Sequence, residues 1–159
     1  MTSWSVQQRG AGDRPRSGER QFVIEQSPGY LVNRLARSMA GQLAERIRPA
    51  GVGIGQWAVL LFLWERDGMS QAELSRVVAI EPPTMVRTID RMVRDGLVTR
   101  VADPADGRVS RIHLTSRGRA LRDELVPMAV AVNEATLGRL TERERAAFQR
   151  LPTKLTATE

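Results

Sequence analysis

Residues 81–98, which read EPPTMVRTIDRMVRDGLV, decide the fold. Two prolines open this stretch and Gly96 closes it, and these residue types favour the first turn and the end of a helix. We therefore expect a helix from Pro82 to about Asp95. At about 100° per residue, its apolar side chains share one sector of about 120°, and they are Met85, Val86, Ile89, Met92 and Val93. The other sector holds Thr84, Arg87, Thr88, Arg91 and Arg94.

The polar face of this helix has the chemistry that the major groove of DNA requires. A guanidinium group binds guanine through two hydrogen bonds, and small hydroxyl side chains contact thymine methyl groups and phosphates. A charged helical face is, by itself, most often only a solvated surface. The neighbouring segments therefore decide whether this helix is expected to read DNA.

A shorter helix is predicted just before this one. Ser70 and Glu73 have the spacing of a capping box, in which each side chain bonds a free backbone amide at a helix start. Two short helices joined by a brief link form a helix-turn-helix, whose second helix enters the major groove. The predicted DNA-contacting set therefore also includes Ser70 and Gln71.

After Gly96 the apolar period changes from that of a helix to that of a strand. Residues 97–101 and 109–114 alternate apolar with polar side chains, and residues 102–108 between them contain Asp-Pro and Asp-Gly turn signals. This pattern predicts a hairpin, which completes a winged helix. We expect Arg108 at its tip to reach a minor groove, with Asp106 holding Arg108 by an ion pair and Arg111 contacting phosphates.

Three further helical segments flank the predicted winged helix. Residues 28–47 carry an apolar residue at every fourth position, and residues 116–138 and 141–155 continue the helical pattern, the last opening with a capping box at Thr141 and Glu144. This is more helix than a minimal winged-helix domain needs. The apolar stripes are expected to pack either in a twofold dimer, the commonest oligomer, or within one subunit.

Composition excludes several classes of function. The chain has 159 residues, no cysteine and one histidine, His113, so disulfides, thiol chemistry and histidine metal clusters are excluded. No nucleotide-binding or nucleophile motif is present. We therefore predict no catalytic residue, no metal site and no cofactor, and the chain offers no set of titratable groups for an enzyme.

The net charge of +6 is concentrated in parts of the chain, and every basic residue except Lys154 is arginine. Residues 1–20 are basic and aperiodic, which predicts a disordered tail. No apolar run reaches the roughly 20 residues that cross a bilayer, and no secretory signal pattern opens the chain. We expect a cytoplasmic protein with no membrane partner.

Residues 103–115, DPADGRVSRIHLT, followed by Gly118, resemble the wing signature of the MarR family of bacterial transcription regulators. That family typically shows Asp-Pro-x-Asp-Arg-Arg, then a strand ending in Leu-Thr and a nearby glycine. The matching residues are Asp106, Arg108, Leu114 and Thr115, whereas Gly107 replaces the usual first arginine. The similarity covers roughly residues 28–150.

The resemblance implies a mainly α fold with a small β-hairpin wing: a winged helix-turn-helix plus N- and C-terminal dimerisation helices. The domains implied are a tail at 1–20, a dimerisation helix at 21–54, a DNA-binding domain at 55–115 and dimerisation helices at 116–159. A homodimer would bind double-stranded DNA at a near-palindromic operator, with half-sites roughly 34 Å apart. Members are most often repressors.

The resemblance also implies that a small, often aromatic, inducer binds between the dimerisation helices and the DNA-binding domain. The residues expected to line that site are Tyr30, Leu35, Trp57 and Leu61. A second hypothesis is a winged helix that binds proteins in an assembly and has no operator of its own. It predicts an exposed apolar patch and no salt-dependent affinity for DNA.

Overall fold

The structure is a computed structural model that describes residues 23–157. The chain divides into two units between residues 34 and 35. The first described unit holds the short helix η1 (Ile24–Gln26) and the start of α1 (Pro28–Ile47). The predicted tail at 1–20 lies outside the described residues.

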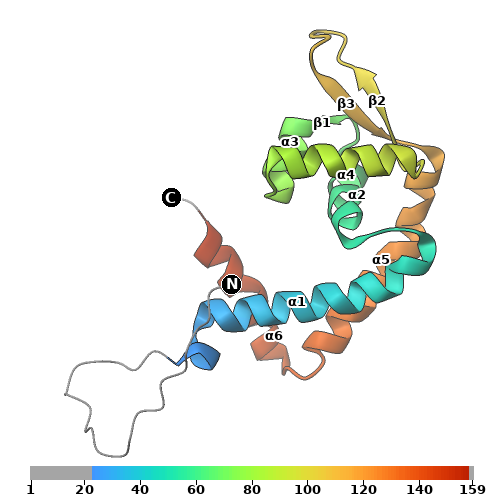
Figure 1. Ribbon diagram of the computed structural model, residues 1–159. Coiled ribbons are helices and arrows are strands. Elements are labelled where there is room, and N and C mark those ends of the chain that lie inside the picture. Colours follow the sequence, from blue (N-terminus) through green and yellow to red (C-terminus); the bar gives the residue numbers. More distant parts are fainter. Residues whose placement is uncertain (1–22, 158–159) are drawn as a thin grey trace, which may run out of the picture. The chain divides into compact units, whose positions relative to one another are not determined.

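The second unit contains the predicted winged helix (Figure 1). Its elements are α2 (Ile54–Glu65), β1 (Met69–Ser70), α3 (Gln71–Val78), α4 (Pro82–Arg94), β2 (Val98–Ala102) and β3 (Ser110–Leu114). The strands form one antiparallel sheet in the order β1-β3-β2, with Met69 opposite Ile112 and Val98 opposite Leu114. The predicted fold class, mainly helical with a small hairpin wing, is confirmed.

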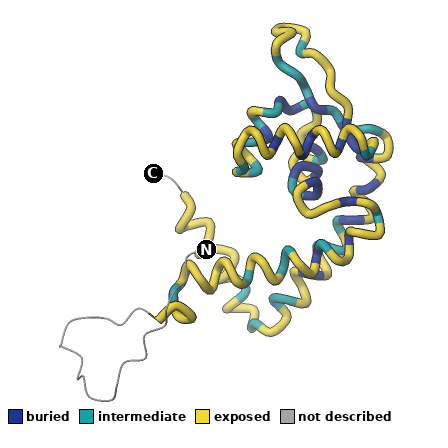
Figure 2. The backbone as a smooth tube through the Cα atoms, in the orientation of Figure 1, coloured by how far each residue is buried: buried dark blue, intermediate teal, exposed yellow. Residues whose placement is uncertain are grey.

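The core of the second unit lies where α4 packs against α2, α3 and the sheet (Figure 2). Met85, Ile89 and Met92 of α4 are fully buried. Other fully buried side chains come from each neighbouring element, and they include Leu60, Leu63, Leu74, Leu97 and Ile112. Burial of these large apolar groups is the main stabilising term for the winged helix.

The predicted orientation of α4 is wrong at three positions. Val86 and Val93 were expected in the core but are 44% and 38% exposed, whereas Thr88, expected on the polar face, is 2% exposed. The Thr88 hydroxyl donates to the Thr84 carbonyl oxygen at 2.9 Å. Because this bond satisfies its only strong polar group within the helix, Thr88 can face the core.

Two glycines are required by the backbone around the wing. Gly96 ends α4 with φ of +67°, a conformation that side chains disfavour. Gly118, in the first turn of α5 (Ser116–Leu137), lies so close to Leu97 that a Cβ atom would overlap the Leu97 carbonyl oxygen. The glycine after the Leu-Thr pair therefore allows α5 to pack closely against the winged helix.

The flanking helices are much less buried than the winged helix. Within α1 only Leu43 and Ile47 are buried, so the predicted apolar stripe is covered only at its C-terminal end, before the short helix η2 (Arg48–Ala50). The last helix, α6 (Glu142–Thr156), buries no residue, although its predicted capping box at Thr141 and Glu144 is confirmed.

Among the described residues, no single helix has the length and hydropathy to cross a bilayer; only residues 28–50 and 54–65 taken together meet that criterion, and they are bent by 82°.

Candidate nucleic-acid interface

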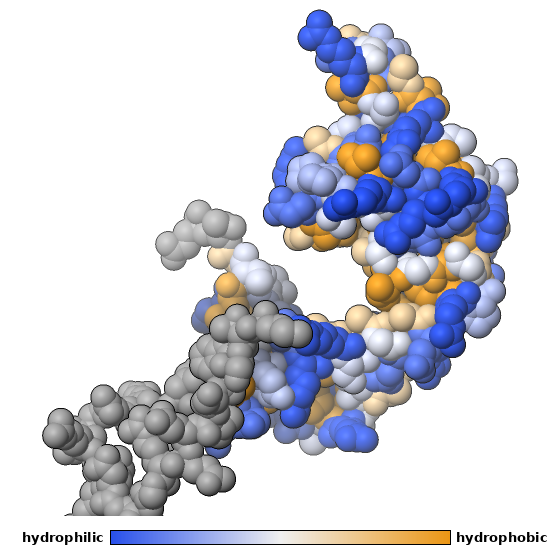
Figure 3. Space-filling view, viewed as in Figure 1, coloured by the Kyte–Doolittle hydropathy of each residue, from blue (hydrophilic) through white to orange (hydrophobic). Residues whose placement is uncertain are grey.

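The outward face of α4 presents arginine side chains to solvent (Figure 3). Arg87, Arg91, Arg94 and Thr84 are all exposed, as predicted. Within residues 23–157, the Arg87 and Arg91 guanidinium groups take part in no ion pair or hydrogen bond, and Arg94 has only a distant partner, Asp95, at 3.7 Å. These cations are therefore available to an anion outside the chain.

An acidic residue that the sequence analysis did not single out lies on the same face. The Asp90 carboxylate accepts a hydrogen bond of 2.7 Å from the Arg100 guanidinium on β2. This ion pair joins α4 to the wing and offsets the negative charge that Asp90 brings among the arginines. Its pairing depends on how α4 and β2 pack, which no local sequence pattern reveals.

Arg111 is paired within the chain, and its predicted phosphate contact stays a prediction. Its Nε donates to Asp103 at 2.5 Å and its Nη1 donates to Glu73 of α3 at 3.1 Å. The hydrogen bond to Asp103 raises the pKa of Arg111. The Ala105 amide, and after it the Arg111 guanidinium, lowers the pKa of Asp103 by stabilising its charged form. Arg111 is thus committed to holding the base of the wing against α3.

At the wing tip, the predicted ion pair between Asp106 and Arg108 is wrong. Asp106 Oδ1 accepts a hydrogen bond of 3.0 Å from the Arg108 backbone amide, and no salt bridge joins the two side chains. Asp103 likewise accepts the Ala105 amide at 2.8 Å. Both aspartates therefore shape the turn, as short acidic side chains often do, and leave the Arg108 side chain exposed.

Ser70 caps α3, and its predicted DNA contact stays a prediction. Ser70 is 9% exposed, and its hydroxyl accepts the Glu73 amide at 3.2 Å while Glu73 accepts the Ser70 amide at 2.8 Å. These bonds confirm the capping box, and the Ser70 amide is the largest cause of the lowered pKa of Glu73. Gln71 is half-buried, and its DNA contact stays a prediction.

A cavity of about 480 Å³ lies among α1, α2 and α5 of the second unit. Trp57 and Leu61 line it, as predicted, but Leu35 does not. The other lining residues are Met39, Ala40, Leu43, Ile54, Val126, Ala129, Val130, Val132 and Asn133. Tyr30 belongs to the first unit, where the Arg34 guanidinium lies 5.8 Å from the centre of its ring. Ligand contacts from Leu35 and Tyr30 stay predictions.

Gln56 links the N-terminal end of α2 to α4, a contact that the sequence analysis missed. Its Nε2 donates to Asp95 Oδ2 at 2.7 Å, and its Oε1 accepts the Gly53 amide at 2.8 Å. Gln56 is 7% exposed and lies between Ile54 and Trp57, both of which line the cavity. The hydrogen bond from Gln56 to Asp95 therefore joins the end of α4 to a residue that stands next to the cavity-lining Trp57 in sequence.

The fold and its arginine-bearing helix define a winged helix-turn-helix protein with additional helices at both ends, and comparisons with known proteins agree. The sequence profile described as the MarR family matches residues 54–110. The transcriptional repressor Rv2887 of Mycobacterium tuberculosis is 30% identical over 127 residues, which cover 80% of this chain and 91% of that protein.

Two solved structures are also similar. Bordetella bronchiseptica BpsR, whose DNA binding is regulated by 6-hydroxynicotinic acid, has a TM-score of 0.80 with 27% identity, covering 88% of this chain and all of BpsR. Rv2887 in complex with p-aminosalicylic acid has a TM-score of 0.67 with 27% identity, covering 82% of this chain and 99% of that one.

This chain belongs to the MarR family, as the wing signature predicted. Members of this family are DNA-binding transcription regulators and not enzymes. The predicted class of protein is therefore confirmed.

Proposed function

We propose that this protein is a dimeric repressor that reads its operator through α4 and leaves it when a small aromatic ligand binds. The observation that carries this proposal is the contrast between the two sides of α4. Its inner side is buried in the core, whereas Arg87 and Arg91 on its outer side have no partner in the described chain. Helices of this form suit the major groove.

We assign the base contacts to Arg87, Arg91 and Thr84 and the backbone contacts to Arg94 and Arg108. Two exposed guanidinium groups one helical turn apart suit guanine edges, which accept two hydrogen bonds from arginine. Arg108 at the wing tip suits the negative potential of a minor groove. Thr88, Ser70 and Arg111 are excluded from this assignment because their polar groups already bond within the chain.

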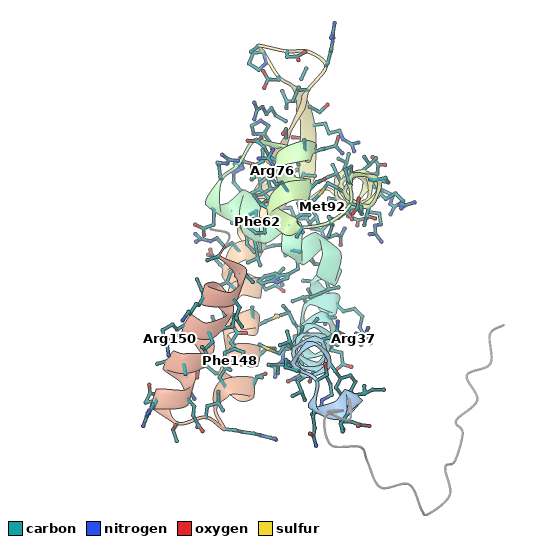
Figure 4. The ribbon with its side chains drawn as sticks, turned by 90° about the vertical axis from the view of Figure 1, so that its left-hand side faces the viewer. Arg37, Phe62, Arg76, Met92, Phe148 and Arg150 are labelled. Carbon is teal, nitrogen blue, oxygen red and sulfur yellow. The ribbon has the colours of Figure 1, made fainter. Side chains whose placement is uncertain are left out.

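We assign dimerisation to the poorly buried helices. Along α6, Phe148, Leu151 and Leu155 are 36%, 46% and 83% exposed, and Figure 4 shows Phe148 and Arg150 on this helix. An apolar face of this kind gains stability when a second copy covers it. A twofold dimer would present α4 twice and would favour a near-palindromic operator. We assign the protein to the cytoplasm, where it would meet this DNA.

We assign ligand binding to the cavity beside Trp57. DNA binding by BpsR is regulated by 6-hydroxynicotinic acid, and Rv2887 binds p-aminosalicylic acid. In this chain, α2 carries both the cavity wall and Gln56, whose amide bonds Asp95 at the end of α4. A ligand that shifts α2 would therefore change the position of α4 through this hydrogen bond.

The test is binding of the purified protein to its own upstream intergenic DNA and to a scrambled duplex across a salt series. We expect specific binding that weakens steeply with salt, because phosphate contacts release counterions. Arg91→Ala should weaken operator binding by about 1–3 kcal/mol, or roughly 5–150-fold. The matched control is Arg150→Ala on α6, which removes the same charge and should leave operator binding unchanged.

Equal, weak binding to both duplexes, unaffected by Arg91→Ala, would contradict the operator proposal. It would instead favour a winged helix that binds proteins and has no operator of its own.

A further inference from the structure

We infer that the ligand of the cavity beside Trp57 is an uncharged aromatic molecule rather than an aromatic acid. This inference rests on the ligand-controlled repression proposed above and narrows it to a chemical class. The cavity wall is built almost entirely from apolar side chains of α1, α2 and α5. No arginine, lysine or histidine of residues 23–157 lines it, and its single amide side chain is Asn133.

Because no cationic side chain is among the described lining residues, the cavity favours an uncharged ligand. 6-Hydroxynicotinic acid and p-aminosalicylic acid both carry a carboxylic acid group, which is ionised at neutral pH. A carboxylate that leaves water for an apolar site needs an opposite charge or several hydrogen bonds to offset its lost hydration. The described residues of one subunit provide neither at this cavity, so they disfavour the aromatic acids seen with the two relatives.

The tryptophans of α2 show which polar group the cavity does provide. Trp64 Nε1 donates to the Gly118 carbonyl oxygen at 2.9 Å. The indole N–H of Trp57, a side chain only 7% exposed, donates to no acceptor in the part of the chain that the structure describes. Trp57 lines the cavity and its unbonded N–H is not among the fully buried polar groups of the described residues, so it can donate to a ligand.

Together these features specify the ligand. The volume of about 480 Å³ lies within the usual range for small-molecule sites. The Trp57 ring, which already packs edge-on against Trp64 with ring centres 5.6 Å apart, can pack against a further aromatic ring. The Trp57 N–H and the Asn133 amide can bind a neutral acceptor such as an amide, ketone or phenol oxygen.

The experiment uses matched pairs of probes that differ in charge and little else. Isothermal titration of the full chain is performed with 6-hydroxynicotinic acid, with p-aminosalicylic acid and with the carboxamide of each. We expect the carboxamides to bind and each acid to bind at least about tenfold more weakly, because burying an unpaired carboxylate costs free energy. The carboxamides, and not the acids, should release the operator duplex.

Two variants test the reason for this preference. Val130 lines the cavity and is 52% exposed, so Val130→Lys should fold and add a cation. It should strengthen binding of the acids about tenfold, while the control Val130→Met should not. Trp57→Phe keeps an aromatic ring but removes the N–H, and it should weaken binding of the carboxamides about fivefold.

Three outcomes would overturn this inference. If an acid binds the wild-type chain as tightly as its carboxamide, the charge argument is wrong while ligand-controlled repression stands. If Val130→Lys leaves the preference unchanged, the cavity is not the binding site. If no probe binds although operator binding is intact, as when a second copy fills the cavity, ligand-controlled repression fails and this inference fails with it.

Discussion

Helices α4 and α6 have similar lengths and similar kinds of residue, yet α4 packs into a core and α6 does not. Both carry arginines and apolar side chains, and α4 buries Met85, Thr88, Ile89 and Met92 whereas α6 buries no residue. The apolar face of α4 is covered by α2, α3 and the sheet of the same chain. The winged helix is therefore complete in one subunit, whereas the apolar face of α6 requires cover from elsewhere.

Replacing a core residue of α4 should have the largest effect. Ile89 is fully buried, and Ile89→Ala should lower the free energy of unfolding by about 2–5 kcal/mol, since it leaves a cavity in a packed core. Val86→Ala, at a position 44% exposed on the same helix, should change it by no more than about 0.5 kcal/mol. Chemical denaturation measures both values, and equal losses would contradict the observed orientation of α4.

The next effect concerns α6 and the proposed dimer. Leu151→Glu places a charge on the exposed apolar face, so sedimentation should show a monomer. Operator affinity should then fall about a hundredfold or more, because two linked α4 helices bind far more tightly than one. The control is Gln149→Glu, which adds the same charge on another side of α6. A Leu151→Glu protein that remains dimeric would place the dimer interface elsewhere.

A smaller effect on the free energy of unfolding is expected at the junction before α4, where a non-glycine residue has a positive φ. Ala79 ends α3 with φ of +57°, whereas Gly138, before α6, has φ of −62°. Ala79→Gly should raise the free energy of unfolding by about 0.5 kcal/mol, because glycine adopts positive φ without steric cost. Ala58→Gly inside α2 should lower it by about 0.5–1 kcal/mol. A loss at both positions would argue against strain at Ala79.

The smallest effect compares the capping boxes of α3 and α6. The pKa of Glu73 is lowered, first by the Ser70 amide, and that of Glu144 is lowered, first by the Thr141 amide. A lowered pKa means that the charged form stabilises the fold, and this contribution is lost as the pH falls below about 4.5, the ordinary value.

The unfolding temperature should therefore fall less between pH 6 and pH 3 in Glu73→Gln than in the wild-type protein. Thermal unfolding at several pH values measures this difference. Because α6 buries nothing in its own chain, Glu144→Gln should change the unfolding of the winged helix less than Glu73→Gln does. A larger effect from Glu144 would mean that α6 unfolds together with the winged helix.

Local signals in the sequence predicted the helices and the hairpin well. The prolines and Gly96 defined α4, and both capping boxes formed as predicted. The two-residue strand β1 was missed because it is too short to show any periodicity. The orientation of α4 was missed because a threonine that bonds its own helix can be buried.

The role of a candidate site residue was predictable only where it depends on whether its side chain is exposed. Arg87 and Arg91 follow from helical periodicity and lie on the surface as expected. Arg111 could not be assigned in the same way, since its partners Asp103 and Glu73 come from different elements. The cavity beside Trp57 likewise depends on the packing of α5 against α1 and α2, which are distant from it in sequence.

Different hydrogen bonds, which meet at Asp103, stabilise the base and the tip of the wing, and this has a consequence for how such a protein changes its target. Arg111 fixes the base through Asp103 and Glu73, whereas the tip is shaped by aspartate bonds to the Ala105 and Arg108 backbone amides. Residues 104, 105, 107 and 108 are all exposed. A change at any of them would alter the surface that we propose contacts DNA at little cost in folding, so the tip can diverge between relatives while the hairpin that carries it stays the same.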